Sequence, residues 1–251
     1  MKVLLTGYSG FLGRHLENHL RREGYSIRIL LHRTAVTARN LAKETEVLWG
    51  SLSDLDVVKQ AVTGVQIVVH AAWAFSSPFV RRPTVNERAA ELLLRESVSA
   101  GVDFFAFISS VAVYGMNSRT NSFIDETSPL IHDRNHSFVY PSEKVAVETL
   151  CRSCDRKSTK LGIFRPGPIF DDKKAPVKKI VRIAGRSYGI GFGGGQNHMA
   201  YIHAEDVARA VILWLKSKQG DLIVNVTPTN CMRHRDWYKN WGMVNGRPVK
   251  P

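Results

Sequence analysis

The chain begins with Met-Lys-Val-Leu-Leu-Thr-Gly-Tyr-Ser-Gly-Phe-Leu-Gly, residues 1–13, and this stretch decides the fold. Its apolar run predicts a buried strand that ends in three spaced glycines, Gly7, Gly10 and Gly13, and the apolar residues beyond them recur at helical spacing. Gly7 permits a tight turn, Gly10 lets the backbone approach a pyrophosphate, and Gly13 allows the helix to pack closely on the strand. Because the helix N-terminus adds unpaired N–H groups and a positive dipole end, the stretch predicts a dinucleotide site.

Strands and helices are expected to alternate along the rest of the chain. Apolar runs predict strands at residues 26–32, 47–49, 66–71, 104–109, 162–164 and 222–226. Periodic segments predict helices at residues 35–43, 55–62, 86–100, 142–154 and 204–216, the second of them capped by Asp54. This alternation predicts an α/β protein with a Rossmann-type, doubly wound parallel sheet and right-handed crossovers.

The pattern changes beyond Arg165, where prolines and glycines gather. We therefore expect residues 1–165, with 204–226 returning to them, to form the dinucleotide-binding domain. Residues 166–203 and 227–251 are expected to form a small substrate-binding lobe, in which 227–251 have no regular structure. The segment after Pro176 is expected to be a short helix with one basic face.

The formal net charge of +13 is concentrated in part in one cluster. Its members are Lys173, Lys174, Lys178, Lys179, Arg182 and Arg186. A solvated surface is the favoured interpretation of such a charge run, and a site for an anionic ligand such as a phosphorylated substrate is the alternative. Nucleic acid is a third option, but no recognised binding module accompanies the charge.

Composition narrows the class of protein further. With 251 residues and 44% hydrophobic content, the chain can bury a sizeable core, and it lacks the run of about 18 apolar residues that a transmembrane helix needs. Three cysteines do not make a disulfide framework, and Cys151 and Cys154 have no second ligand pair, so no metal site is expected. We expect a cytoplasmic protein without a membrane partner.

The end of the second predicted strand discriminates between the two nicotinamide cofactors. An acidic residue there would bond the ribose hydroxyls, whereas an arginine accommodates the 2′-phosphate of NADP. The chain has His32-Arg33-Thr34 at this point and no carboxylate before Glu44. Arg33 therefore favours NADP over NAD.

A catalytic set is suggested by Ser110, which follows the fifth strand, and by Tyr140 and Lys144, which lie one helical turn apart. A nearby ammonium is expected to lower the pKa of Tyr140 toward neutrality, which suits proton exchange in a hydroxyl–carbonyl interconversion. Ser110 can hold the substrate oxygen at the carboxyl end of the neighbouring strand.

These residues together resemble the extended short-chain dehydrogenase/reductases, also called the NAD-dependent epimerase/dehydratase family. The resemblance runs over about residues 3–226. It rests on Thr6 to Gly13, His70-Ala71-Ala72, Asn86, Ser110, Tyr140, Lys144, Arg165-Pro166-Gly167-Pro168, Tyr201-Ile202-His203 and Asp206-Val207-Ala208. It implies a Rossmann domain, a nicotinamide cofactor and Ser–Tyr–Lys catalysis, with Lys144 also holding the nicotinamide ribose.

The resemblance also implies a set of cofactor contacts. They are Gly7, Ser9, Gly10, Phe11, Leu12, Gly13, Arg33, Ser51, Leu52, Ala71, Ala72, Tyr140, Lys144 and Pro166, with Ser51 in the place of the family's usual aspartate. A homodimer formed through the helices after strands four and five is a further expectation. Members of the family are usually longer, so we expect the C-terminal lobe to be either reduced or cut short where the chain ends.

The leading functional hypothesis is an NADP-dependent oxidoreductase acting on a small or phosphorylated, anionic substrate. A nucleotide-sugar epimerase with a tightly bound cofactor would use the same residues, and a dehydratase ranks third because no acidic pair adjoins Ser110. A non-catalytic NADP-sensing or RNA-binding protein is the alternative of another class. The presence of Ser110, Tyr140 and Lys144 argues against it.

Overall fold

A computed structural model places the elements of the chain. It describes residues 1–32, 45–75, 84–115, 123–131, 139–172, 180–183, 186–189, 196, 198–233, 235–236, 243–244 and 247–250. Among these residues, no helix is long and apolar enough to cross a membrane.

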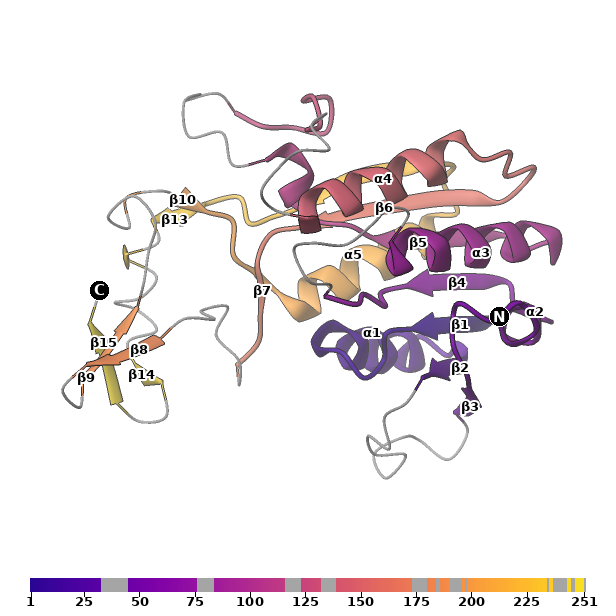
Figure 1. Ribbon diagram of the computed structural model, residues 1–251, viewed down its shortest axis with the longest axis horizontal. Coiled ribbons are helices and arrows are strands. Elements are labelled where there is room, and N and C mark those ends of the chain that lie inside the picture. Colours follow the sequence, from indigo (N-terminus) through magenta and orange to yellow (C-terminus); the bar gives the residue numbers. More distant parts are fainter. Residues whose placement is uncertain are drawn as a thin grey trace.

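The centre of the fold is a seven-stranded parallel sheet (Figure 1). Its strands, in spatial order, are β12 (Leu222–Val226), β6 (Lys160–Pro166), β5 (Phe104–Ile108), β4 (Ile67–His70), β1 (Lys2–Thr6), β2 (Ser26–Leu31) and β3 (Glu46–Trp49). The strand order reverses between β1 and β4, and the carboxyl edge at such a reversal is where open α/β sheets bind ligands. The predicted Rossmann-type, doubly wound fold is confirmed.

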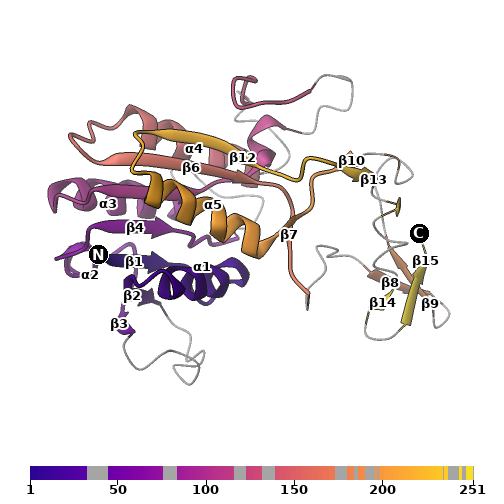
Figure 2. The same ribbon diagram turned by 180° about the vertical axis from the view of Figure 1, so that it is seen from behind.

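Helices cover both faces of the sheet (Figures 1 and 2). One face carries α1 (Phe11–Arg22) and α5 (Ala204–Ser217), and the other carries α2 (Leu55–Val62), α3 (Val85–Ser99) and α4 (Val139–Ser153). Asp54 caps α2 as expected, by accepting hydrogen bonds from the N–H groups of Asp56 and Val57.

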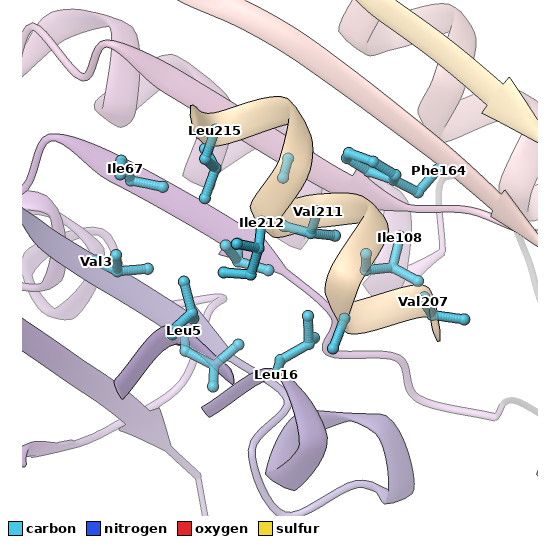
Figure 3. Packing of buried hydrophobic residues seen from close by; sticks show 14 of the residues in the cluster. Val3, Leu5, Leu16, Ile67, Ile108, Phe164, Val207, Val211, Ile212 and Leu215 are labelled. Carbon is cyan, nitrogen blue, oxygen red and sulfur yellow. The ribbon is translucent and has the colours of Figure 1, made fainter. Parts of the chain in front are cut away.

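Two separate hydrophobic cores result, because side chains alternate between the two faces of each strand. Val3 and Leu5 point into the core under α1 and α5, the same core that contains Leu16 (Figure 3). Leu4, between them in sequence, points into the core under α2, α3 and α4.

Two expectations about the second half of the chain are wrong. The segment after Pro176 is no helix over the part that is described, because β8 (Ile180–Ile183) pairs antiparallel with β9 (Arg186–Gly189). Two isoleucines and a valine in this short run favour a strand over a helix, and the basic residues obscured that preference.

The tail after Thr227 is also not without regular structure. It contains the short strands β13 (Met232–Arg233), β14 (Met243–Val244) and β15 (Arg247–Lys250). β13 pairs with β10 (His198–Met199), and β15 pairs with both β14 and β9. Strands of two to four residues are too short to show an alternating pattern of apolar and polar residues. They form through pairing with strands that lie elsewhere in the sequence.

Three shorter elements complete the fold. The 3₁₀ helix η2 (Val111–Tyr114) follows β5, and β7 (Ile169–Phe170) pairs in parallel with β11 (Ile202–His203). The division into a dinucleotide domain and a substrate lobe stays a prediction.

Candidate active site

The glycine turn after β1 owes its shape to close backbone contacts. Gly7 has φ +81°, and a Cβ there would lie 2.5 Å from the Ala71 carbonyl carbon and the Ala72 nitrogen. A Cβ at Gly13 would lie 2.2 Å from the Gly7 oxygen. The Gly10 N–H donates to that same Gly7 oxygen at 3.0 Å. Only glycine fits at Gly7 and Gly13, so the predicted reason for these two residues holds.

The turn has the features of an anion cradle. Gly10 is the N-cap of α1, no described side chain caps it, and the first turn contains no acidic residue. Ser9 and Gly10 are exposed, and Phe11 and Leu12 are half-buried. A positive helix end whose own first turn carries no acidic residue suits the pyrophosphate of a dinucleotide. These residues therefore fit the expected cofactor.

The loop after β4 is tied to the glycine turn. The Thr6 hydroxyl is 2.8 Å from Nδ1 of His70 and also accepts a hydrogen bond from the Ala72 N–H at 3.4 Å. Burial, reinforced by the charge of Lys144, lowers the pKa of His70 to about 3. His70 is therefore neutral at physiological pH and acts as a packing and hydrogen-bonding residue rather than as a base.

Tyr140 and Ser110 meet at the carboxyl edge of the sheet. Helix α4 begins at Val139, three residues before the expected start, so Tyr140 lies in its first turn. Burial raises the pKa of Tyr140, and a hydrogen bond with the Ser110 side chain opposes this less strongly. The pKa of Tyr140 is thus raised where the sequence predicted a lowering by Lys144, because loss of hydration is the largest influence on the phenol.

Lys144 lies one turn further along α4 and is almost fully buried. Its Nζ donates to the Ile108 carbonyl oxygen at 2.7 Å and sits 3.5 Å from the centroid of the Trp73 ring. Burial lowers the pKa of Lys144 to about 7, against the opposing charges of Glu148 and Glu143. The Lys144 Nζ also lies 5.8 Å from the centroid of the Tyr140 ring.

A buried ion pair anchors the strand end that carries Ser110. Glu148 accepts hydrogen bonds from Arg165 at 2.6 Å and from the Ser109 hydroxyl at 2.5 Å. Arg165 also donates to the Tyr114 hydroxyl at 2.7 Å, and Tyr114 donates to Asn225 at 2.7 Å. The sequence did not predict this network. Its one local signal is Glu148, an acidic residue one helical turn after Lys144.

A second polar pair fixes the loop after β4. The Asn86 side chain accepts from the Ala74 N–H at 2.9 Å and donates to the Ala74 carbonyl at 2.8 Å. It also donates to the buried Glu143 carboxylate at 3.4 Å. Asn86 entered the sequence analysis only through the family resemblance, and its function as a clamp on this loop is a finding of the structure.

Aromatic rings surround Tyr140. The Phe75 ring is stacked on it at a centroid distance of 5.8 Å and an angle of 23°, and the Trp73 ring meets it edge-on at 5.9 Å. We call Trp73, Phe75 and Tyr140 the aromatic corner. Trp73 and Phe75 belong to no motif in the sequence that marks them as site residues.

The remaining expected cofactor contacts either have described contacts within the protein only or lie outside the described residues. Arg33 is not among the described residues, nor are Lys173 to Lys179 of the basic cluster. Ser51 follows β3 and accepts a hydrogen bond from the Ser53 N–H at 3.1 Å, and Leu52 packs against the core under α2. Pro166 is the buried last residue of β6. The functions of these residues remain predictions.

Comparisons with known proteins agree with this arrangement. A family model described as the NAD dependent epimerase/dehydratase family matches residues 3–227. An uncharacterised protein of Sinorhizobium fredii is 29% identical over 218 residues, which make up 84% of this chain and 52% of that protein. The ceramide reductase of Caulobacter vibrioides is 24% identical over 216 residues, or 86% of this chain and 61% of the reductase. The chain thus spans about half to three fifths of the length of these two relatives.

Among solved structures, MoeE5 in complex with UDP-glucose and NAD superimposes with a TM-score of 0.77 at 22% identity. The match covers 100% of this chain and 84% of that one. At this level of identity, the likeness concerns the fold alone.

Proposed function

Because the chain belongs to the NAD dependent epimerase/dehydratase family, we propose that it is an NADP-dependent oxidoreductase that interconverts a hydroxyl and a carbonyl group. The observation that carries this proposal is the hydrogen bond between Ser110 and Tyr140, with Lys144 buried one helical turn away. A phenol in such surroundings can exchange a proton with a substrate oxygen.

Three residues of the chain would carry out the proton transfer. Tyr140 stays a protonated phenol near pH 7, because burial raises its pKa, and it donates that proton to a substrate carbonyl oxygen. Ser110 holds the same oxygen. Lys144, with its pKa near 7, restores the proton on Tyr140. When the nicotinamide is bound, the hydride is exchanged between its ring and the substrate carbon.

Each expected contact residue is proposed to bind a particular part of the cofactor. The glycine turn from Gly7 to Gly13, with Ser9, Phe11 and Leu12, would hold the pyrophosphate. Ser51 and Leu52 would lie by the adenine, Ala71, Ala72 and Pro166 would line the path to the nicotinamide, and Tyr140 and Lys144 would bond its ribose. Arg33 would meet the 2′-phosphate, which is the reason to propose NADP.

We further propose that the substrate is a small molecule with an anionic part. The formal net charge of +13 supports this, because a basic surface raises the local concentration of anions. The reductase among the relatives supports reduction of a carbonyl as the reaction.

The cofactor assignment is tested by titrating the protein with NADPH and NADH while following protein fluorescence. We expect NADPH to bind at least about tenfold more tightly than NADH, and Arg33→Ala to remove most of that preference, because a charged hydrogen bond is worth about 1.5–3 kcal/mol. Arg95→Ala, which changes an exposed arginine on α3, is the matched control and should keep the preference. Equal affinities in the wild type would reject NADP.

A nucleotide-sugar epimerase is the second candidate, which the description of the matching family model favours. A dehydratase is less well supported, because the buried carboxylates of α4 are engaged: Glu148 pairs with Arg165, and Asn86 donates to Glu143. Product analysis separates the candidates. Net consumption of NADPH indicates a reductase, whereas turnover without change in the reduced-nicotinamide absorbance indicates an epimerase. Tyr140→Phe should lower kcat by at least about 100-fold in either case.

A further inference from the structure

We propose that the aromatic corner is a binding subsite for an apolar, planar group of the substrate, adjacent to the carbonyl that reacts. The inference rests on the proposed function, because it takes Tyr140 as the residue that exchanges the proton. It adds the chemical class of the group that lies beside the reacting carbon, and it makes Phe75 a specificity-determining residue.

The first support is that Phe75 is exposed while it is stacked on Tyr140. Its side chain is 75% exposed, whereas Phe107 on the neighbouring strand is 0% exposed. A single exposed aromatic residue is common on protein surfaces and would carry no inference by itself. Phe75 differs because its ring lies parallel to the ring of the proposed proton donor.

The second support is that the loop bearing Phe75 is fixed from within the protein. The buried Asn86 side chain bonds both the N–H and the carbonyl of Ala74, the residue between Trp73 and Phe75. Asn86 is in turn bonded to Glu143, which is 1% exposed. A buried polar pair that clamps the backbone beside an exposed ring holds that ring in one position, which is what a preformed binding surface needs.

The third support comes from Trp73. Its indole N–H is buried and has no hydrogen-bond partner among the described residues, which is costly for the folded chain. A phenylalanine would avoid that cost and still pack on Phe107. Trp73 uses one ring face to hold the Lys144 ammonium and meets Tyr140 edge-on, so it links the corner to the proposed proton relay.

These contacts favour an apolar occupant over a hydroxyl-rich one. Phe75 and the ring of Trp73 offer carbon surface to whatever lies over them, and hydroxyl groups placed there would lose water without gaining partners. A flat apolar group gains both burial and ring stacking. The hydroxyl groups of Ser110 and Tyr140 and the ammonium of Lys144 are already assigned to the reacting oxygen and the ribose, and the remaining donor, the Trp73 indole N–H, is buried.

The test measures the reduction of two ketones by the full chain with NADPH. The ketones differ in the polarity of the group attached to the carbonyl. Acetophenone carries a planar apolar group on its carbonyl, and hydroxyacetone carries a small polar one. We expect kcat/KM to be higher for acetophenone, and Phe75→Ala to reduce the ratio of the two values by about three- to tenfold. Phe75→Tyr keeps the ring and should keep the ratio. Leu213→Ala removes an exposed apolar side chain from α5 and should change neither value.

Binding provides a readout that needs no turnover. Calorimetric titration of the protein saturated with NADP⁺ should show tighter binding of acetophenone than of hydroxyacetone, with the difference reduced in Phe75→Ala. Equal binding of the two ketones, or equal losses for both in the variant, would overturn the apolar subsite. Failure of the proposed function would look different: NADP⁺ and NADPH would not bind, or Tyr140→Phe would retain full turnover.

Discussion

At the scale of single residues, Lys144 has the most unusual surroundings in the candidate site. The residue is 4% exposed, and its ammonium is held by one carbonyl oxygen and the faces of aromatic rings. The groups that face it are Glu143 and Glu148 on its own helix, His70 on β4 and the ring of Tyr140. Two carboxylates therefore do not fully offset the loss of water around the charge.

This burial makes folding stability depend on pH in a defined direction. The folded-state pKa of Lys144 is about 7, below its ordinary value of 10.5, so the unfolded chain binds the extra proton between these values. The contribution of Lys144 to stability is therefore full above pH 10.5 and is lost as pH falls toward 7. We expect the free energy of unfolding to rise with pH in this window, by up to about 1.4 kcal/mol per pH unit from this group.

Urea unfolding at pH 7, 8 and 9 measures this dependence, with Lys144→Met as the variant that removes the group. The difference between wild type and variant isolates Lys144 from other groups that titrate in this range. Lys59→Met, which changes an exposed lysine on α2, should keep the wild-type slope. A slope that Lys144→Met leaves unchanged would show that the lysine is not held near neutrality.

At the scale of elements, the Glu148–Arg165 pair joins α4 to β6 and, through Ser109, to the end of β5. Glu148→Gln leaves the Arg165 guanidinium buried without a counter-charge, so we expect a loss of about 3–5 kcal/mol in the free energy of unfolding. The double variant Glu148→Gln/Arg165→Met removes both charges and should be more stable than Glu148→Gln alone. Chemical denaturation of the three proteins checks this order, and a double variant that is the least stable would contradict it.

The elements also show how far the sequence leads. The strands of the central sheet were predictable because they are apolar runs, and helices α1 to α5 because their apolar residues recur at helical spacing. The helix predicted over residues 35–43 lies outside the described residues. The strand β8 was not predicted, because the basic residues interleaved with its apolar residues imitate one face of a helix. In the candidate site, Ser110, Tyr140 and Lys144 were visible as residue types at fixed spacing. The contacts of Trp73, Asn86 and Glu148 depend on side chains brought together from different strands and helices, which no local pattern encodes.

At the scale of the whole molecule, the central sheet separates two cores, which have no residue in common in the part of the chain that the structure describes. Leu16 on α1 lies in one core and Leu93 on α3 in the other, and both side chains are fully buried. Each substitution by alanine should cost about 2–5 kcal/mol, since it removes buried methylene groups and leaves a cavity.

Because the two cavities would lie on opposite faces of the sheet, we expect the losses to add within about 0.5 kcal/mol in the double variant Leu16→Ala/Leu93→Ala. Denaturant titration of the two single variants and the double variant measures the sum. A single unfolding transition in all three would show that both cores belong to one cooperative unit. Two transitions, or strong non-additivity, would argue against this.

The close approach of Gly7 to the backbone of Ala71 and Ala72 has a consequence for how the two proposed ligands affect each other's binding. The glycine turn, which would bind the phosphates, packs backbone against backbone on the loop that carries Trp73 and Phe75. No side chain of Gly7 separates the two segments. A ligand that orders the glycine turn should therefore also order the loop that carries Trp73 and Phe75. The two ligands should consequently strengthen each other's binding by the same factor, whichever arrives first.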